Sequence, residues 1–143
     1  MFVEKVWWYR NFQCSVIFGE MGHRCGYVAV PKETKIPMVG DEDWTYCDLN
    51  CHGGITLDET PKRTMGARKQ YAGIMVGDGM RILGFDCGHA WDHPDMEALD
   101  RRGMRQPYSY ELMLAAEGTV RTQQYCETEC RNLVDQIMEE NNG

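Results

Sequence analysis

The sequence has no long apolar run. Its mean hydropathy is −0.52, and its apolar stretches are only a few residues long. A membrane-spanning helix needs about 20 predominantly apolar residues, so we expect no membrane partner. The start of the chain also lacks a basic region followed by the long apolar stretch of a secretory signal. These absences favour a cytoplasmic protein.

Proline is scarce, and neither repeats nor low-complexity segments interrupt the chain. Hydrophobic residues make up 43% and charged residues 26% of the 143 residues, which is close to the globular average. This composition argues against collagen, coiled coil and low-complexity disorder. The length favours a single domain over residues 1–143.

Basic residues are outnumbered, since 15 Lys and Arg against 22 Asp and Glu give a net charge of −7. General nucleic-acid binding is therefore not expected, because phosphate neutralisation needs a basic face. The basic residues nevertheless cluster in two expected loops, which either serve solubility or bind a small anion. These residues are Lys62, Arg63, Arg68 and Lys69 in one loop, and Arg101, Arg102 and Arg105 in the other.

The seven cysteines show no repeated spacing, and their number is odd. Without a signal sequence, this pattern favours free thiols in a reducing compartment. Cys126 and Cys130 lie four residues apart on the apolar face of an expected helix, where free cysteine packs as a small hydrophobe.

Short segments rich in β-branched and aromatic residues predict strands in the first two-thirds of the chain. Segments 14–18 and 25–30 are expected to be two joined strands. Segment 31–46 contains two prolines and an acidic run, so we expect a loop there.

Two further hairpins are expected at glycine-rich turns. Segments 47–52 and 55–58 flank a Gly-Gly pair, which permits the positive φ angles of a two-residue turn. Segments 72–76 and 80–86 flank Gly-Asp-Gly, and Asp-Gly is a strong turn signal.

Segment 123–138 has apolar residues at a period of 3.6, which predicts an amphipathic helix with Thr122 as its N-cap. Shorter helices are expected at 94–100, with Pro94 in the first position, and at 109–117. We therefore expect an α+β fold in which an antiparallel sheet of four or more strands carries the C-terminal helix on one face.

All four histidines stand beside glycine or acidic residues. Glycine next to histidine lets a ligand approach the backbone closely. The expected strand that ends at Asp86 and Cys87 leads directly into His89, and such strand ends commonly display functional groups. The expected ligand-binding residues are His23, His52, Gly53, Gly54, Asp86, His89, Trp91 and Asp92.

Three functional uses of these residues compete with a purely structural role. In the first, His52, Asp86 and His89, with or without Asp92, ligate divalent zinc, manganese or iron. No HxH, HxxxH or CxxC spacing supports this use, so we expect no metal or other cofactor and keep a divalent metal as the alternative.

In the second use, Cys87 is a nucleophile with His52 or His89 as its base, and Asp86 orients that base. The catalytic candidates are then His52, Asp86, Cys87 and His89. In the third use, the residues form a polar pocket that binds a ligand by hydrogen bonds. In the structural role, His52 and Asp86 are buried partners of one another.

The motifs GHRCGYVAVP, DLNCHGGITLD and ILGFDCGHAWD, followed by the terminal helix, resemble a family of small phage and prophage proteins. The family motifs are GHxCGYVxVP, VHGGIT and GFDCxHAxD, in that order, and the resemblance extends from Cys14 to Ile137. Cys51 departs from it, because the family has an aliphatic residue there. The matching residues are His23, Gly26, Tyr27, His52, Gly53, Gly54, Gly84, Phe85, Asp86, Cys87, His89 and Asp92.

The resemblance implies a phage accessory protein that acts against host defences in the host cytoplasm. The leading hypothesis is a pocket that binds a small anionic ligand, such as a nucleotide-derived immune signal. One alternative is a hydrolase that uses the same pocket, which leaves open whether the protein is an enzyme. The other is a protein–protein inhibitor of a host defence effector, of the anti-CRISPR type, acting through the acidic loop 41–43 or exposed aromatic residues.

Overall fold

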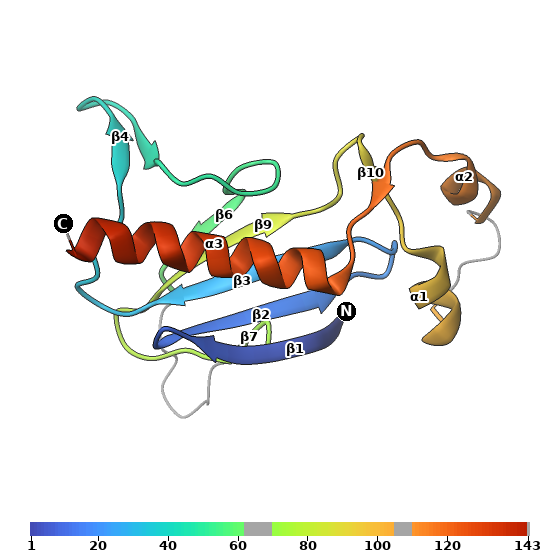
Figure 1. The fold of residues 1–143 in the computed structure, drawn as a ribbon, viewed down its shortest axis with the longest axis horizontal. Coiled ribbons are helices and arrows are strands. Elements are labelled where there is room, and N and C mark those ends of the chain that lie inside the picture. The colour runs from blue at the N-terminus through green and yellow to red at the C-terminus, as the bar shows by residue number, and fades with distance from the viewer. Residues whose placement is uncertain (62–69, 105–109, 143) are drawn as a thin grey trace.

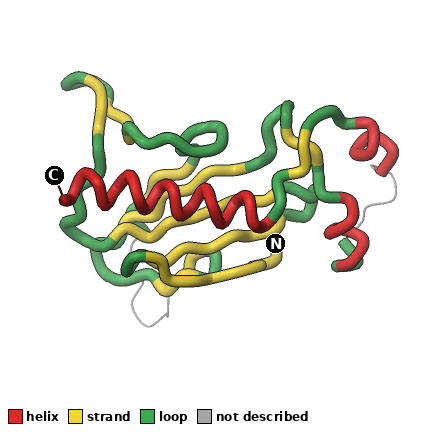
Figure 2. The backbone as a smooth tube through the Cα atoms, in the orientation of Figure 1, coloured by secondary structure: helices red, strands yellow, loops and turns green. Residues whose placement is uncertain are grey.

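A five-stranded antiparallel sheet with strand order β1-β2-β3-β9-β6 forms the centre of the computed structural model, which describes residues 1–61, 70–104 and 110–142. Helix α3 lies across one face of the sheet, and two short helices lie at one end (Figures 1 and 2). The expected α+β class is confirmed. Among the described helices, none is long and apolar enough to cross a membrane.

The strands of the sheet are β1 (Phe2–Tyr9), β2 (Phe12–Phe18), β3 (Arg24–Val30), β9 (Arg81–Asp86) and β6 (Leu57–Glu59). Three short pairs lie outside the sheet: β4 (Met38–Gly40) with β5 (Thr45–Cys47), β7 (Gln70–Tyr71) with β8 (Ile74–Met75), and β10 (Asp92–His93) with β11 (Thr119–Val120). The described helices are α1 (Met96–Arg101), α2 (Tyr110–Ala115) and α3 (Gln123–Asn142).

The predicted apolar stripe of α3 forms the main contact between helix and sheet. Thr122 precedes the helix, and its Oγ1 accepts a hydrogen bond of 3.1 Å from the backbone N–H of Tyr125, as an N-cap does. Most of the stripe is buried against β2 and β3, with Met138 half-buried at its end, which confirms the predicted packing of the helix on the sheet. Its buried members are Cys126, Cys130, Leu133, Val134 and Ile137.

Gly26 lets α3 approach the sheet closely. A Cβ atom at this position of β3 would lie 2.4 Å from the Phe85 ring and 2.9 Å from Cys130 Sγ. Both distances are shorter than any normal carbon contact, so a larger residue would push the helix away from the sheet.

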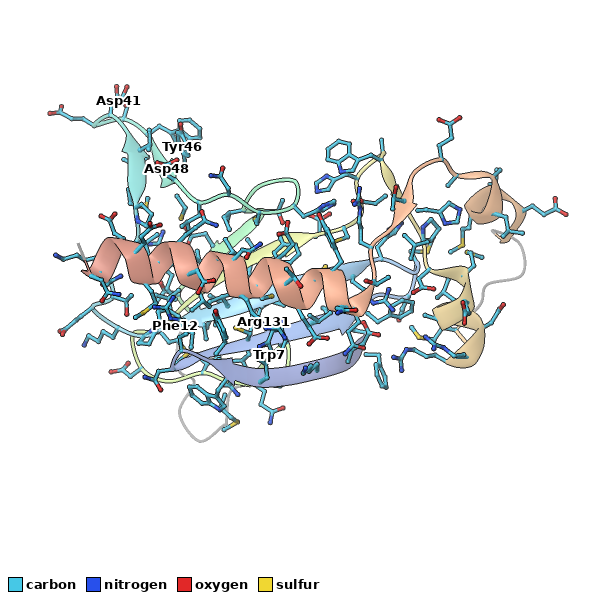
Figure 3. All side chains as sticks on the ribbon, viewed as in Figure 1. Trp7, Phe12, Asp41, Tyr46, Asp48 and Arg131 are labelled. Atoms are coloured by element: carbon cyan, nitrogen blue, oxygen red, sulfur yellow. The ribbon has the colours of Figure 1, made fainter. Side chains whose placement is uncertain are left out.

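The edge strand β1 was not expected from the sequence. It pairs with β2 through a tight turn in which Arg10 and Asn11 have φ angles of 49° and 68°. Trp7 packs against the core beneath α3 (Figure 3), whereas the next residue, Trp8, is 67% exposed. Successive side chains of a strand point to opposite faces, so these neighbouring tryptophans cannot both face the core.

The expected hairpin of segments 47–52 and 55–58 is wrong. Gly53 and Gly54 do form a turn with φ angles of 68° and 82°, but the flanking residues pair elsewhere. Strand β6 adds to β9, while β5 pairs with β4. The expected loop at 31–46 is therefore wrong in part, because it contains β4 and the start of β5.

The expected pairing of segments 72–76 and 80–86 is also wrong. Both edges of β9 are occupied, one by β3 and the other by β6, so β9 has no edge left for segment 72–76. Instead, β8 pairs with β7 across a turn at Ala72 and Gly73, which both have positive φ.

The two expected short helices are present with shifted ends. Helix α1 begins at Met96 because Asp95 is its N-cap, and the Asp95 side chain accepts a 3.0 Å hydrogen bond from the Ala98 N–H. Pro94 therefore precedes the cap and is not the first helical residue. The helix expected at 109–117 is α2.

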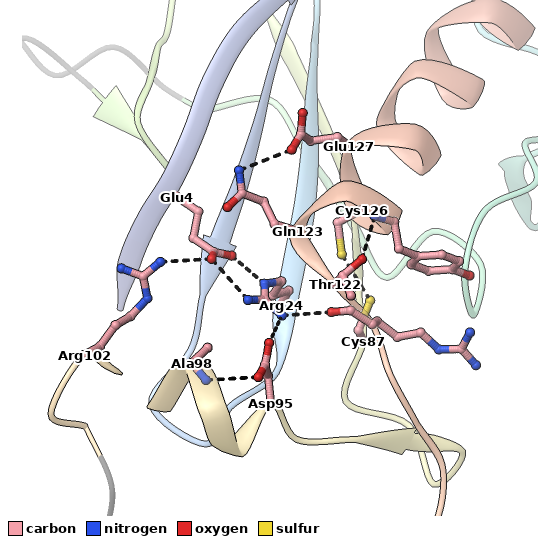
Figure 4. Close-up of polar contacts among 12 residues, drawn as sticks. Glu4, Arg24, Cys87, Asp95, Ala98, Arg102, Thr122, Gln123, Cys126 and Glu127 are labelled. Atoms are coloured by element: carbon pink, nitrogen blue, oxygen red, sulfur yellow. Dashed lines mark hydrogen bonds and ion pairs between the residues drawn. The ribbon is translucent and has the colours of Figure 1, made fainter. Parts of the chain in front are cut away.

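A buried ion-pair cluster joins α1 to the sheet (Figure 4). The Arg24 guanidinium, 3% exposed, donates through Nε and a second nitrogen to both oxygens of Glu4, at 2.6 and 3.2 Å. Its remaining nitrogen donates to Asp95 at 2.8 Å and to the backbone oxygen of Arg121 at 3.0 Å. Arg102 adds a 3.1 Å contact to Glu4. The cluster thus links β1, β3, α1 and the segment that leads into α3.

The Leu133→Ala variant should lose about 2–5 kcal/mol of stability, because a fully buried side chain leaves a cavity beneath α3. Chemical denaturation measures the free energy of unfolding. The control is Leu112→Ala, at a position 77% exposed, which should change stability by no more than about 0.5 kcal/mol. Equal effects of the two substitutions would contradict the packing described here.

The stability of the Asp95→Asn variant should depend less on pH in the acidic range than that of the unsubstituted protein. Burial raises the pKa of Asp95, but hydrogen bonds from the Ala98 N–H and from Arg24 outweigh it and bring the pKa below the ordinary 3.8. A carboxylate with a lowered folded-state pKa stabilises the fold above its unfolded-state pKa, and this stabilisation is lost as the pH falls through the folded-state pKa.

Urea denaturation between pH 5 and pH 2 tests this expectation. The stability of Asp95→Asn should fall less steeply with decreasing pH than that of the unsubstituted protein, while asparagine still caps the helix. Asp78→Asn, on an exposed turn, controls for the change in net charge. Parallel pH curves for Asp95→Asn and the unsubstituted protein would count against the cluster.

Candidate functional site

Three segments that are distant in sequence meet beside the start of α3. The turn at Gly53 and Gly54 supplies His52, the loop after β9 supplies His89 and Trp91, and β10 supplies Asp92. Arg121 precedes α3, and Tyr125 lies in its first turn. Strand β10 is fixed beside this helix start because it pairs in parallel with β11.

Asp92 is the centre of the site, and its side chain is completely buried. One carboxylate oxygen accepts from His52 Nε2 at 2.9 Å and from the His89 backbone N–H at 3.1 Å. The other accepts from Arg121 Nε at 2.9 Å. Burial raises the pKa of Asp92, but these hydrogen bonds outweigh it and lower the pKa. Asp92 is therefore a buried anion that several donors stabilise.

His52 connects Asp92 to Tyr125. Its Nδ1 lies 2.8 Å from the Tyr125 hydroxyl, and the two rings meet edge to face. With Asp92 ionised, Nε2–H donates to the carboxylate, and the Nδ1 of a neutral ring accepts the hydroxyl proton of Tyr125. The chain Asp92–His52–Tyr125 thus runs from the buried carboxylate to a half-buried phenol.

His89 has an unused polar atom. Its ring stacks on the exposed Trp91 at 4.7 Å with an interplanar angle of 10°. Its Nε2 is buried but has no hydrogen-bond partner among the described residues. A Cβ on Gly53 would lie 2.1 Å from this nitrogen. Only glycine permits the approach, and Gly53 also has a positive φ angle.

A cavity of about 400 Å³ adjoins the cluster. His23, His89 and Asp92 form its polar wall. The remaining wall is mostly apolar and comes from residues around α2 and from the turn before β3. These other lining residues are Met21, Ala90, Pro94, Leu112, Met113, Ala116 and Glu117.

Asp86 is not the buried partner of His52 that the structural role predicted, because His52 pairs with Asp92. Asp86 is 39% exposed and accepts a hydrogen bond from the Gly88 N–H. Its nearer oxygen is 3.7 Å from His89 Nε2, which is too far for a hydrogen bond. Asp86 therefore lies at the edge of the cluster. Asp92 instead accepts hydrogen bonds from the His52 ring and from the backbone N–H of His89.

Cys87 directly follows β9, and its side chain belongs to the hydrophobic core. It is buried in the core, and its sulfur lies 3.7 Å from that of Cys126. The contact with Cys126 and burial raise the pKa of Cys87, which opposes formation of a thiolate. All seven cysteines are free, and this catalytic candidate is a core residue.

Most of the basic residues in the two expected loops lie outside the part of the chain that the structure describes. Residues 62–69 and Arg105 lie outside the described residues. The guanidinium of Arg102 binds Glu4 and stacks over the Phe2 ring at 3.8 Å. Gly54 belongs to the turn beside His52, and a Cβ there would meet nothing within 4 Å.

Arg121 and Tyr125 are site residues that were not predicted from the sequence. Arg121 lies immediately before the N-cap Thr122, and Tyr125 follows the cap by three residues. The start of a helix is therefore the one local signal that marks these positions. Tyr125 lies 73 residues after its partner His52, and Arg121 lies 29 residues after its partner Asp92. Nothing in the sequence connects the members of either pair.

No protein family, curated protein sequence or solved structure matches this chain.

The Asp92→Asn variant should be less stable by about 1–3 kcal/mol, because His52 and Arg121 lose a buried, charged partner. Asp86→Asn is the matched control, since it makes the same change on a partly exposed side chain, and its effect should stay within about 0.5 kcal/mol. Thermal and urea denaturation at pH 7 measure both. A larger loss for Asp86→Asn would contradict the central position of Asp92.

Proposed function

We propose that this protein binds a small ligand in the cavity beside His89, and that the ligand combines an apolar part with an anionic or hydrogen-bonding group. The observation that carries the proposal is the position of the cavity, whose polar wall contains two members of the His52–His89–Asp92 cluster. Its volume of about 400 Å³ falls within the usual range of roughly 300–1,000 Å³ for small-molecule sites.

The two sides of the cavity suit the two parts of such a ligand. Leu112, Met113 and Pro94 offer apolar contact, while His23 and His89 offer ring nitrogens. Hydrogen bonds to a few placed polar groups, with apolar contact elsewhere, are the usual basis of specificity in such pockets. A nucleotide-derived ligand has both kinds of surface. The further proposal of an anti-defence role in a phage-infected cell rests on the family resemblance.

Inhibition of a host protein is the second candidate, and the β4–β5 hairpin favours it. The hairpin extends away from the sheet, and Figure 3 shows Asp41 at its tip and Tyr46 on its side. Trp44 is 69% exposed and packs against Tyr46 at 5.0 Å. Aromatic residues such as these are enriched at protein interfaces. The hydrolase alternative retains the Asp92–His52–Tyr125 chain but loses Cys87 as a nucleophile.

A panel of nucleoside monophosphates, cyclic mononucleotides and cyclic dinucleotides tests the proposal by isothermal titration calorimetry. At least one member should bind with one ligand per chain. His89→Ala should weaken that binding by at least about tenfold, which corresponds to 1.4 kcal/mol or one good hydrogen bond. Trp44→Ala should leave it unchanged.

The two variants separate the candidate functions. Absence of binding across the panel would refute a nucleotide-derived ligand. An equal loss in Trp44→Ala and His89→Ala would refute the cavity as the binding site. The melting temperature of each variant must stay within a few degrees of that of the unsubstituted protein, so that a loss of binding reports on the cavity and not on folding.

A further inference from the structure

We propose that His52, His89 and Asp92 together bind a divalent transition-metal ion at the wall of this cavity. One ligand atom from each residue lies within 4.8 Å of the other two. Two imidazoles and a carboxylate form a donor set that suits zinc, manganese and iron. The residues come from two separate segments, and Asp92 has its side chain completely buried.

The state of His89 is the first argument for an ion. A buried ring nitrogen normally has a hydrogen-bond partner, because burying an unpaired polar atom costs free energy. Among the described residues, His89 Nε2 has no such partner, while Trp91 stacks on one face of its ring and Gly53 approaches it closely. The protein thus orients the His89 imidazole by packing and leaves its Nε2 available to bind a ligand.

The surroundings of the other two ligands are the second argument. Arg121 holds one oxygen of Asp92 and leaves the other directed at His52. Tyr125 lies at the far nitrogen of His52, and its hydroxyl is 3.5 Å from a Glu129 oxygen. Metal-binding histidines and carboxylates commonly have such outer partners, which orient them.

Metal binding requires a shift of one proton on His52 and a movement of the His89 ring. In the metal-free protein, Nε2–H donates to Asp92. With the proton on Nδ1, the ring donates to the Tyr125 oxygen, the Tyr125 hydroxyl turns to Glu129, and the Nε2 lone pair becomes available. No proton leaves the site. Tetrahedral ligand atoms around zinc lie about 3.4 Å apart at the usual bond lengths, so the His89 ring must move inward.

The ion would explain how an acidic protein recognises an anion at this place. Asp92 and Glu117 bring negative charge to the cavity wall, and Arg121 is already paired with Asp92. A divalent ion reverses the local sign and leaves coordination positions for a carboxylate or phosphate oxygen. This last step rests on the proposed function, whereas metal binding itself can be measured without any ligand.

Calorimetric titration of chelator-treated protein with Zn²⁺ alone tests the site. We expect one ion per chain. His89→Gln should weaken binding by more than the roughly 10–100-fold cost of losing an outer partner, and Tyr125→Phe should weaken it within that range. His93→Gln changes a neighbouring histidine that is outside the cluster and should bind Zn²⁺ as the unsubstituted protein does. Because His89 Nε2 makes no hydrogen bond to any residue that the structure describes, the fold should tolerate His89→Gln.

Cysteine side chains are the other residues of this chain that bind zinc well, so two measurements test whether cysteine takes part in the site. Cys51→Ser should not change the affinity. The Co²⁺-loaded protein should show ligand-field absorption without a thiolate-to-metal charge-transfer band. Absence of saturable Zn²⁺ binding, an unchanged affinity in His89→Gln, or a thiolate band would each overturn the metal site. None of these results depends on whether a nucleotide binds, so the two proposals can fail separately.

Discussion

The buried charge of Arg24 is the constraint on which the rest of the structure depends. A guanidinium that is 3% exposed must be paired, because an uncompensated buried charge costs several kcal/mol. Glu4 and Asp95 provide that pairing from the first strand and from the cap of α1, and the Arg121 carbonyl completes it. The Arg121 side chain then binds Asp92. Arg121 therefore connects the Arg24 ion-pair cluster to the histidines of the site.

The elements that the sequence predicts well are those with a complete local signal. The stripe of α3 and its Thr122 cap lie within one segment, and β2 and β3 are bounded by their own turn residues. The segment of β9 was also predicted, but its partners were not. Pairing depends on which edges are free, and both edges of β9 are taken by strands remote in sequence. Strand β1 lacked a turn glycine, because Arg10 and Asn11 adopt the positive φ angles themselves.

The residues of the site likewise divide into those with a local signal in the sequence and those without one. The pairing of glycine with histidine in the sequence indicated His52 and His89, and the structure brings them together because Gly53 permits close approach. The choice between Asp86 and Asp92 was not decidable locally, since both flank His89 by three residues. Asp92 is the buried one because β10 pairs with β11, and that contact joins residues about 27 positions apart in the chain.

The dispersed origin of the cluster has a consequence for biosynthesis. Tyr125 and Arg121 enter the chain long after His52, and both must leave the ribosome before Asp92 and His52 gain their full set of partners. A nascent chain that ends before α3 has the histidines but also lacks the helix that covers the sheet. Any binding by the cluster therefore begins only after α3 has left the ribosome, which is the same step that closes the core.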